Sequence, residues 1–75
     1  MVSEEEVTKI VAGALGIDNK AVSKNSKMAD FPEWDSLGHL TILAALEDEL
    51  GDRYSESEDL STAVSISDLL LALNR

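Results

Sequence analysis

The sequence predicts an all-α fold: a four-helix bundle of three longer helices and one short one, with a long loop between the first two. Apolar residues recur at helical spacing in three segments, and serines followed by acidic residues precede several of them. The third observation is the absence of cysteine from the 75 residues. Disulfides and thiolate metal sites are thereby excluded, so stability must come from helix packing. We treat residues 1–75 as a single domain, because a chain of this length supports one thin core.

The first helix is predicted over about residues 3–15. Ser3 and Glu6 have the spacing of a capping box, and Gly16 is a typical C-terminal stop. One apolar face follows the i, i+3, i+4 pattern: Val7, Ile10, Val11, Ala14 and Leu15.

Residues 16–35 lack sustained periodicity and are predicted to form the long loop. Loops of this length in compact domains are usually functional or disordered. Apolar residues recur along it, and we expect them to anchor the loop on the core: Ile17, Val22, Met28, Phe31 and Trp34.

Three further helices follow the loop. The second helix is predicted from Asp35-Ser36 to Leu50, before Gly51. The sequence Ser55-Glu56-Ser57-Glu58 predicts a capping box and a short third helix ending at about Ser61. Ser65-Ile66-Ser67-Asp68 predicts the start of the fourth, whose apolar face is Ile66, Leu69, Leu70 and Leu73.

The second helix is apolar on two sides, although a surface helix needs only one apolar stripe. At about 100° per residue, one stripe holds four large aliphatic residues with His39 near its centre: Ile42, Leu43, Leu46 and Leu50. We predict that this stripe faces the core. The smaller stripe of Leu37, Leu40 and Ala44, flanked by Glu47 and Asp48, has the character of a docking surface. The alternative is that the third helix or the long loop covers it.

The formal net charge is −9, and the charge is unevenly distributed. Acids and bases cancel in residues 1–27, whereas residues 28–74 hold eleven acids and one base, Arg53. This half should repel nucleic acids and anionic lipids and attract proteins with basic docking surfaces. The plainer alternative is that the acids only keep the protein in solution. Without a membrane-length apolar run or a signal-peptide pattern, the chain is predicted to be cytoplasmic.

Catalytic and metal chemistry have little support. His39 is the only histidine, so multi-histidine metal sites are excluded. A Ser36–His39 dyad is conceivable, but both residues lie on one helix and His39 belongs to the core stripe. We therefore expect a core or edge histidine, no metal site and no enzyme activity.

The sequence Asp35-Ser36-Leu37, which opens an amphipathic helix after a long loop, resembles the attachment site of acyl carrier proteins. The resemblance covers nearly the whole chain. Leu15-Gly16-Ile17 is similar to the family's first turn, and Ala45-Leu46-Glu47-Asp48-Glu49-Leu50 is similar to the acidic end of its second helix. Ile66, Leu69 and Leu73 match its last helix.

This resemblance implies a carrier without catalysis of its own. In the family, a phosphopantetheinyl transferase esterifies the serine hydroxyl with 4'-phosphopantetheine from coenzyme A, and acyl groups are carried on the thiol as thioesters. Ser36 would be the attachment site, and Asp35 would present it to the transferase and its metal. Leu37, Leu40, Glu47 and Asp48 would contact acyl-loading and acyl-processing enzymes, with the protein acting as a monomer.

The residues themselves leave alternatives open. Ser36 in isolation is also a good helix N-cap, and Asp35 is a good cap or dipole partner. Gly38 and Thr41 stand where many fatty-acid carriers have acids, and Trp34 stands where a small residue is common. These departures favour a specialised pathway, such as polyketide synthesis, over fatty acid biosynthesis. A peptidyl or aminoacyl carrier would share the arm but not the cargo, and an unmodified acidic adaptor would have neither.

Overall fold

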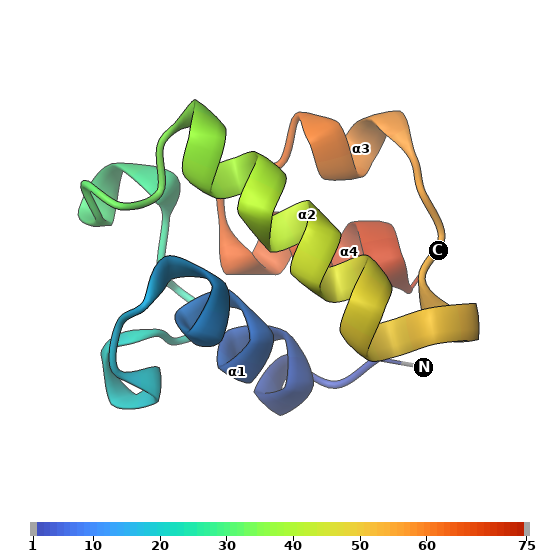
Figure 1. Ribbon diagram of the computed structural model, residues 1–75, viewed down its shortest axis with the longest axis horizontal. Coiled ribbons are helices and arrows are strands. Elements are labelled where there is room, and N and C mark those ends of the chain that lie inside the picture. The colour runs from blue at the N-terminus through green and yellow to red at the C-terminus, as the bar shows by residue number, and fades with distance from the viewer. Residues whose placement is uncertain (1, 75) are drawn as a thin grey trace.

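The computed structural model describes residues 2–74, and over this range it confirms the predicted all-α bundle (Figure 1). The four α-helices are α1 (Glu4–Leu15), α2 (Ser36–Leu50), α3 (Glu58–Ser61) and α4 (Ile66–Leu73). Three short 3-10 helices lie between them: η1 (Asn19–Ala21), η2 (Met28–Asp30) and η3 (Gly51–Arg53). None of the helices within residues 2–74 has the length and apolar content needed to cross a bilayer.

The helix ends follow the predicted capping patterns, with one correction. Ser3 Oγ accepts from the Glu6 amide at 3.2 Å, and the Glu6 carboxylate accepts from the Ser3 amide at 3.3 Å. Gly16 ends α1 with a left-handed φ of 70°. The prediction that the third helix starts at Ser55 was wrong, because Ser57 caps α3 through the Leu60 amide. Leu60 is fully buried, so its packing determines which of the two serines reaches the helix start.

All four helices contribute to one core, which lies behind α2 in the view of Figure 1. The predicted face of α1 is rotated slightly, since Thr8 and Ala12 are buried while Ile10 and Ala14 are only partly covered. The Thr8 hydroxyl donates to the Glu5 carbonyl at 3.0 Å, so its burial leaves no unpaired polar atom. The largest fully buried side chains are Trp34, Ile42, Leu46, Leu60, Ile66, Leu69, Val7 and Val11.

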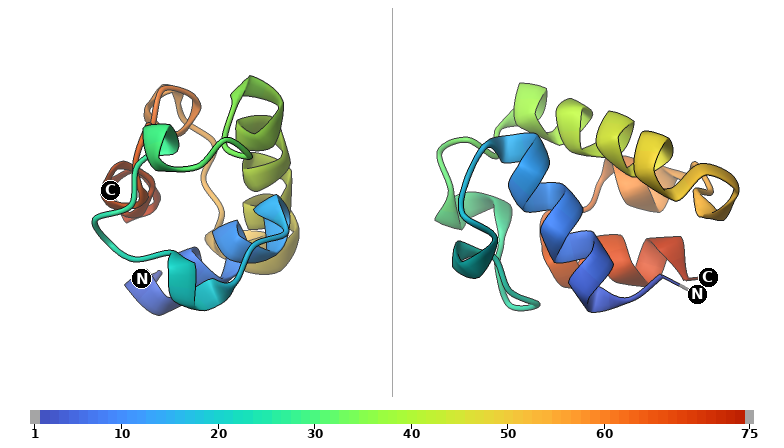
Figure 2. Two further views of the ribbon diagram at one scale, coloured as in Figure 1. Left: turned by 90° about the vertical axis from the view of Figure 1, so that its left-hand side faces the viewer. Right: turned by 60° about the horizontal axis from the view of Figure 1, so that its bottom comes forward.

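The long loop between α1 and α2 is pinned to this core, as predicted. Val22 and Trp34 are buried, and Ile17, Met28 and Phe31 are partly buried against the core. The loop also makes backbone bonds to the segment that enters α4, which the sequence did not predict. The Met28 amide donates to the Val64 carbonyl at 2.8 Å, and the Ile66 amide donates to the Ser26 carbonyl at 3.0 Å. These bonds explain why a loop of this length has a defined path (Figure 2).

Side-chain contacts also join segments that are distant in the sequence. Asn74 exchanges two hydrogen bonds with the backbone of Val2, at 2.7 and 2.8 Å, so these two residues lie side by side. Arg53 binds Glu6 with two nitrogens, the shorter distance being 2.8 Å. The end of α2 is therefore held beside the start of α1.

Candidate functional site at the start of helix α2

Asp35, not Ser36, caps helix α2. The backbone of Asp35 is extended, and its Oδ1 accepts from the Gly38 amide at 2.7 Å. The Asp35 carbonyl accepts from the His39 amide at 2.8 Å. Ser36 is therefore the first residue inside the helix, and the capping role considered for it belongs to its neighbour.

Ser36 is exposed, and its hydroxyl makes no hydrogen bond to any group in residues 2–74. The backbone amides of Ser36 and Leu37 also lack an acceptor in this range, because the capping bonds go to Gly38 and His39. A helix N-terminus with open amides carries a partial positive charge. An accessible hydroxyl thus stands where a phosphate group would be electrostatically favoured.

Gly38 lets the loop pass close to the first turn of α2. A Cβ at this position would overlap the carbonyl oxygen of Glu33, which is backbone and cannot swing away. Gly38 stands where the resemblance to acyl carrier proteins would favour an acid. In this chain the path of the loop excludes any side chain there.

His39 is buried, with 6% of its surface exposed, as predicted for the core stripe. Its Nδ1 accepts from Trp34 Nε1 at 3.0 Å, and its Nε2 lies 2.9 Å from the Leu60 carbonyl oxygen. Because the indole N–H only donates and the carbonyl only accepts, the imidazole proton must be on Nε2. Both ring nitrogens are engaged, so a Ser36–His39 dyad is excluded. The histidine instead joins the loop, α2 and α3.

The smaller apolar stripe of α2, formed by Leu37, Leu40 and Ala44, is exposed along its whole length. Leu37 is 73% exposed and Leu40 is 63% exposed, so neither α3 nor the long loop covers them. We call these three residues the front stripe. Glu47 and Asp48, which flank it, are also exposed. Of the predicted core stripe, Ile42, Leu46 and Leu50 are buried and Leu43 is partly buried against the core. The predicted division of α2 into a core side and an open side is confirmed.

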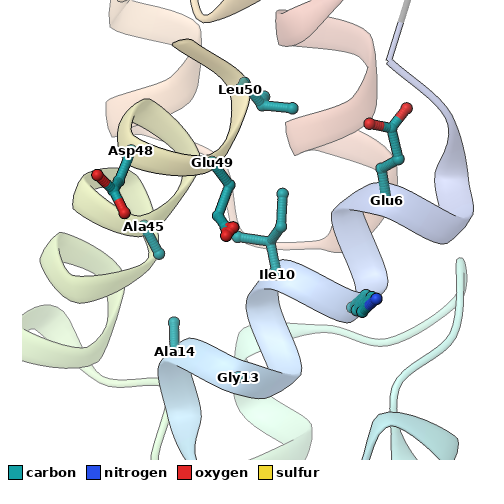
Figure 3. A pocket seen from close by; sticks show the side chains of 9 residues that line it. Glu6, Ile10, Gly13, Ala14, Ala45, Asp48, Glu49 and Leu50 are labelled. Atoms are coloured by element: carbon teal, nitrogen blue, oxygen red, sulfur yellow. The ribbon is translucent and has the colours of Figure 1, made fainter.

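A groove of about 530 Å³ runs between α1 and α2, and the sequence did not predict it (Figure 3). Its apolar surface comes from Ile10, Ala14, Ala45 and Leu50. Acidic side chains stand at its edges: Glu6, Asp48 and Glu49. The hydrogen bonds from Arg53 hold the pKa of Glu6 below its ordinary value, so this carboxylate stays charged near neutral pH.

The structure brings several of the predicted site residues together and separates others. Asp35, Ser36 and the front stripe follow one another from the start of α2, and Asp48 lies where the front stripe and the groove meet. Comparisons of the chain with models of protein families, with curated proteins and with solved structures find no match. The functional argument therefore depends on the local geometry of α2.

Proposed function

We propose that this protein is an acyl carrier protein, which holds acyl groups as thioesters on a 4'-phosphopantetheine arm attached to Ser36. The observation that carries the proposal is the position of Ser36. It is exposed, its hydroxyl is not bonded within residues 2–74, and Asp35 fills the capping role that would otherwise explain a serine at a helix start.

The local electrostatics suit the product of such a modification. In the transfer, the Ser36 hydroxyl gives up its proton and its oxygen bonds to the phosphorus that carries pantetheine, while the pyrophosphate bond of coenzyme A breaks and adenosine 3',5'-bisphosphate leaves. The resulting phosphodiester is an anion beside the unpaired amides of Ser36 and Leu37, where the helix dipole stabilises negative charge. Asp35 uses Oδ1 for the cap, and its second oxygen would be available to the transferase and its metal.

The front stripe gives the partner enzymes a surface to recognise. Two large leucines, Leu37 and Leu40, are exposed beside Ser36, with Glu47 and Asp48 further along the same helix. Exposed apolar residues with a charged border are typical of protein interfaces. Basic docking surfaces on a phosphopantetheinyl transferase and on acyl-processing enzymes would complement the acids. A tethered arm then raises the local concentration of the cargo at each docked enzyme.

The proposal is tested by incubating the purified protein with coenzyme A, magnesium and a broad-specificity phosphopantetheinyl transferase, and measuring its intact mass. The wild type should gain one phosphopantetheine, and Ser36→Ala should gain none. Ser61→Ala, which removes another exposed serine with no side-chain bond in the described residues, should be modified like the wild type. A folded wild type that stays unmodified would overturn the proposal and favour an acidic adaptor.

A further inference from the structure

The groove between α1 and α2 contains a glycine that the fold itself does not require. Gly13 lies inside α1, where glycine costs about 1 kcal/mol relative to alanine. Its φ is not positive, and a Cβ built on it would meet no atom within 4 Å. Neither backbone conformation nor close packing accounts for this glycine. Its effect is to leave the groove open along α1.

The end of the molecule that contains the groove is strongly acidic. The first turn of α1 carries Glu4, Glu5 and Glu6, and the last turn of α2 carries no base. The residues at that end of α2 are Glu47, Asp48 and Glu49, where the helix dipole is itself negative. The Glu6–Arg53 ion pair brings these two helix ends together. Among residues 2–74, Lys9 is the base that lines the groove, and Arg53 is occupied by Glu6.

We propose that this groove docks a cationic, apolar-faced helical segment of a partner protein. The apolar surface of Ile10, Ala14 and Ala45 would receive the apolar face of the segment, and the acidic edges would pair with its lysines or arginines. The small side chains of Gly13, Ala14 and Ala45 would let the backbone of the segment approach closely. An anionic lipid surface or a nucleic acid would be repelled by the same edges.

The groove and the front stripe are neighbouring surfaces of α2 with Asp48 at their border, but the groove lies away from Ser36. Ala45 follows Ser36 by nine residues, which is about 13 Å along the helix and about half a turn around it. A partner held in the groove would therefore leave Ser36 and Leu40 uncovered for a second protein. The inference does not depend on modification of Ser36, so each proposal can fail without the other.

The test uses a synthetic peptide of about 14 leucines and lysines at amphipathic helical spacing, roughly 21 Å long, as a probe. Its binding to the isotopically labelled full chain is followed by amide chemical shifts in NMR spectra. The groove residues, among them Ile10, Ala14 and Ala45, should shift. Gly13→Leu would place a large side chain in the groove, starting from a Cβ that meets no atom within 4 Å, and should weaken binding about tenfold or more. Glu49→Lys should weaken binding too, because it reverses a charge at the edge.

Matched controls separate groove binding from simple charge attraction. Gly13→Ala, which adds one methyl group, and Leu40→Ala, which truncates the front stripe, should bind the peptide within about twofold of the wild type. A lysine-only peptide of equal charge should bind about tenfold more weakly or worse. Equal binding of that peptide, wild-type affinity of Gly13→Leu, or shifts confined to Leu37, Leu40 and Ala44 would each overturn the inference.

Discussion

Ser36 and His39 lie three residues apart on α2 and have opposite surroundings. Ser36 is open to solvent and has no partner within residues 2–74, whereas His39 is buried with both ring nitrogens bonded. A buried imidazole without partners would be unfavourable, so its place in the core depends on Trp34 and Leu60. We interpret His39 as a structural residue that holds the loop and α3 against α2, close to the candidate attachment site.

Replacing His39 tests this interpretation. His39→Phe would leave the Trp34 N–H and the Leu60 carbonyl buried without partners, and should lower the free energy of unfolding by about 3 kcal/mol. His39→Gln keeps one hydrogen-bond acceptor and one donor, so its free energy of unfolding should fall by less. Urea denaturation followed by circular dichroism measures both. If the two variants are equally stable, the hydrogen bonds do not hold the site together.

Replacing Gly38 of α2 and Gly13 of α1 by alanine should change the stability of the protein in opposite directions. Gly38→Ala would push a methyl group into the Glu33 carbonyl, so the loop must move and the protein should lose stability and accept phosphopantetheine more slowly. Gly13→Ala meets open space and should stabilise α1 by about 1 kcal/mol. Thermal melts and transfer rates of both variants check this. A neutral Gly38→Ala would contradict the close approach of loop and helix.

For single residues, the sequence predicted roles that depend on near neighbours in the chain. It missed roles that depend on residues distant in the sequence. The caps at Ser3 and Ser65 could be predicted because each serine and the backbone amide that donates to it lie three residues apart. The hydrogen bonding of His39 could not be predicted in full, since its partner Leu60 lies 21 residues away. For Ser36 and Asp35 the sequence left the capping role open, and only the backbone geometry assigns it to Asp35.

Among the elements, α2 determines both the core and the surface on which the proposed function depends. Its hydrophobicity is nearly even around the axis, yet only one side has other elements to pack against. Because α3 has only four residues and contributes Leu60 to the core, it reaches the core side of α2 but leaves Leu37 and Leu40 exposed. The open stripe is therefore a consequence of how little chain is available to cover it.

A pair of glutamate substitutions separates the two sides of α2. Leu46 is fully buried, so Leu46→Glu would place an unpaired charge in the core and should cost about 4 kcal/mol or more. Leu40→Glu replaces an exposed side chain and should change stability by within about 0.5 kcal/mol, while slowing phosphopantetheine transfer. Circular dichroism and transfer kinetics distinguish them. Wild-type transfer by a folded Leu40→Glu would show that the transferase does not use the front stripe.

Apolar spacing predicted that the helices form and which side of α2 faces the core, but it did not predict where α3 starts. Ser55 is followed by Glu58 at capping-box spacing, whereas Ser57 has Leu60 at that position, so the sequence favoured a start at Ser55. The choice depends on where Leu60 reaches the core, which is a tertiary effect. The groove was missed for a similar reason. Ile10 and Ala14 match the apolar face of α1, and only the packing of α2 against α1 shows that they stay partly open.

For the molecule as a whole, charge is the dominant surface property. The chain has 15 acids against six bases, and the Arg53–Glu6 pair is the salt bridge that the structure shows within residues 2–74. Most carboxylates therefore repel one another in the folded state. Such repulsion is compatible with the proposed role of the acids in attracting basic partners.

The melting temperature should consequently rise with added salt. Raising sodium chloride from about 10 mM to about 1 M shortens the screening length from roughly 30 Å to roughly 3 Å. An increase of about 4 °C or more, corresponding to about 1 kcal/mol, is expected for a domain of this size. Magnesium chloride at equal ionic strength reveals any direct binding as an additional rise. A melting temperature that does not respond to salt would show that the acids are spaced too widely to repel.

The central claim is tested most directly by locating phosphopantetheine on the modified chain. Lys27 and Arg53 are consecutive tryptic sites, and the peptide 28–53 between them contains one serine, Ser36, and one threonine, Thr41. After treatment with transferase and coenzyme A, fragmentation of this peptide should place the whole adduct on Ser36. An adduct on any other peptide, or on Thr41, or none at all on the folded protein, would contradict the account.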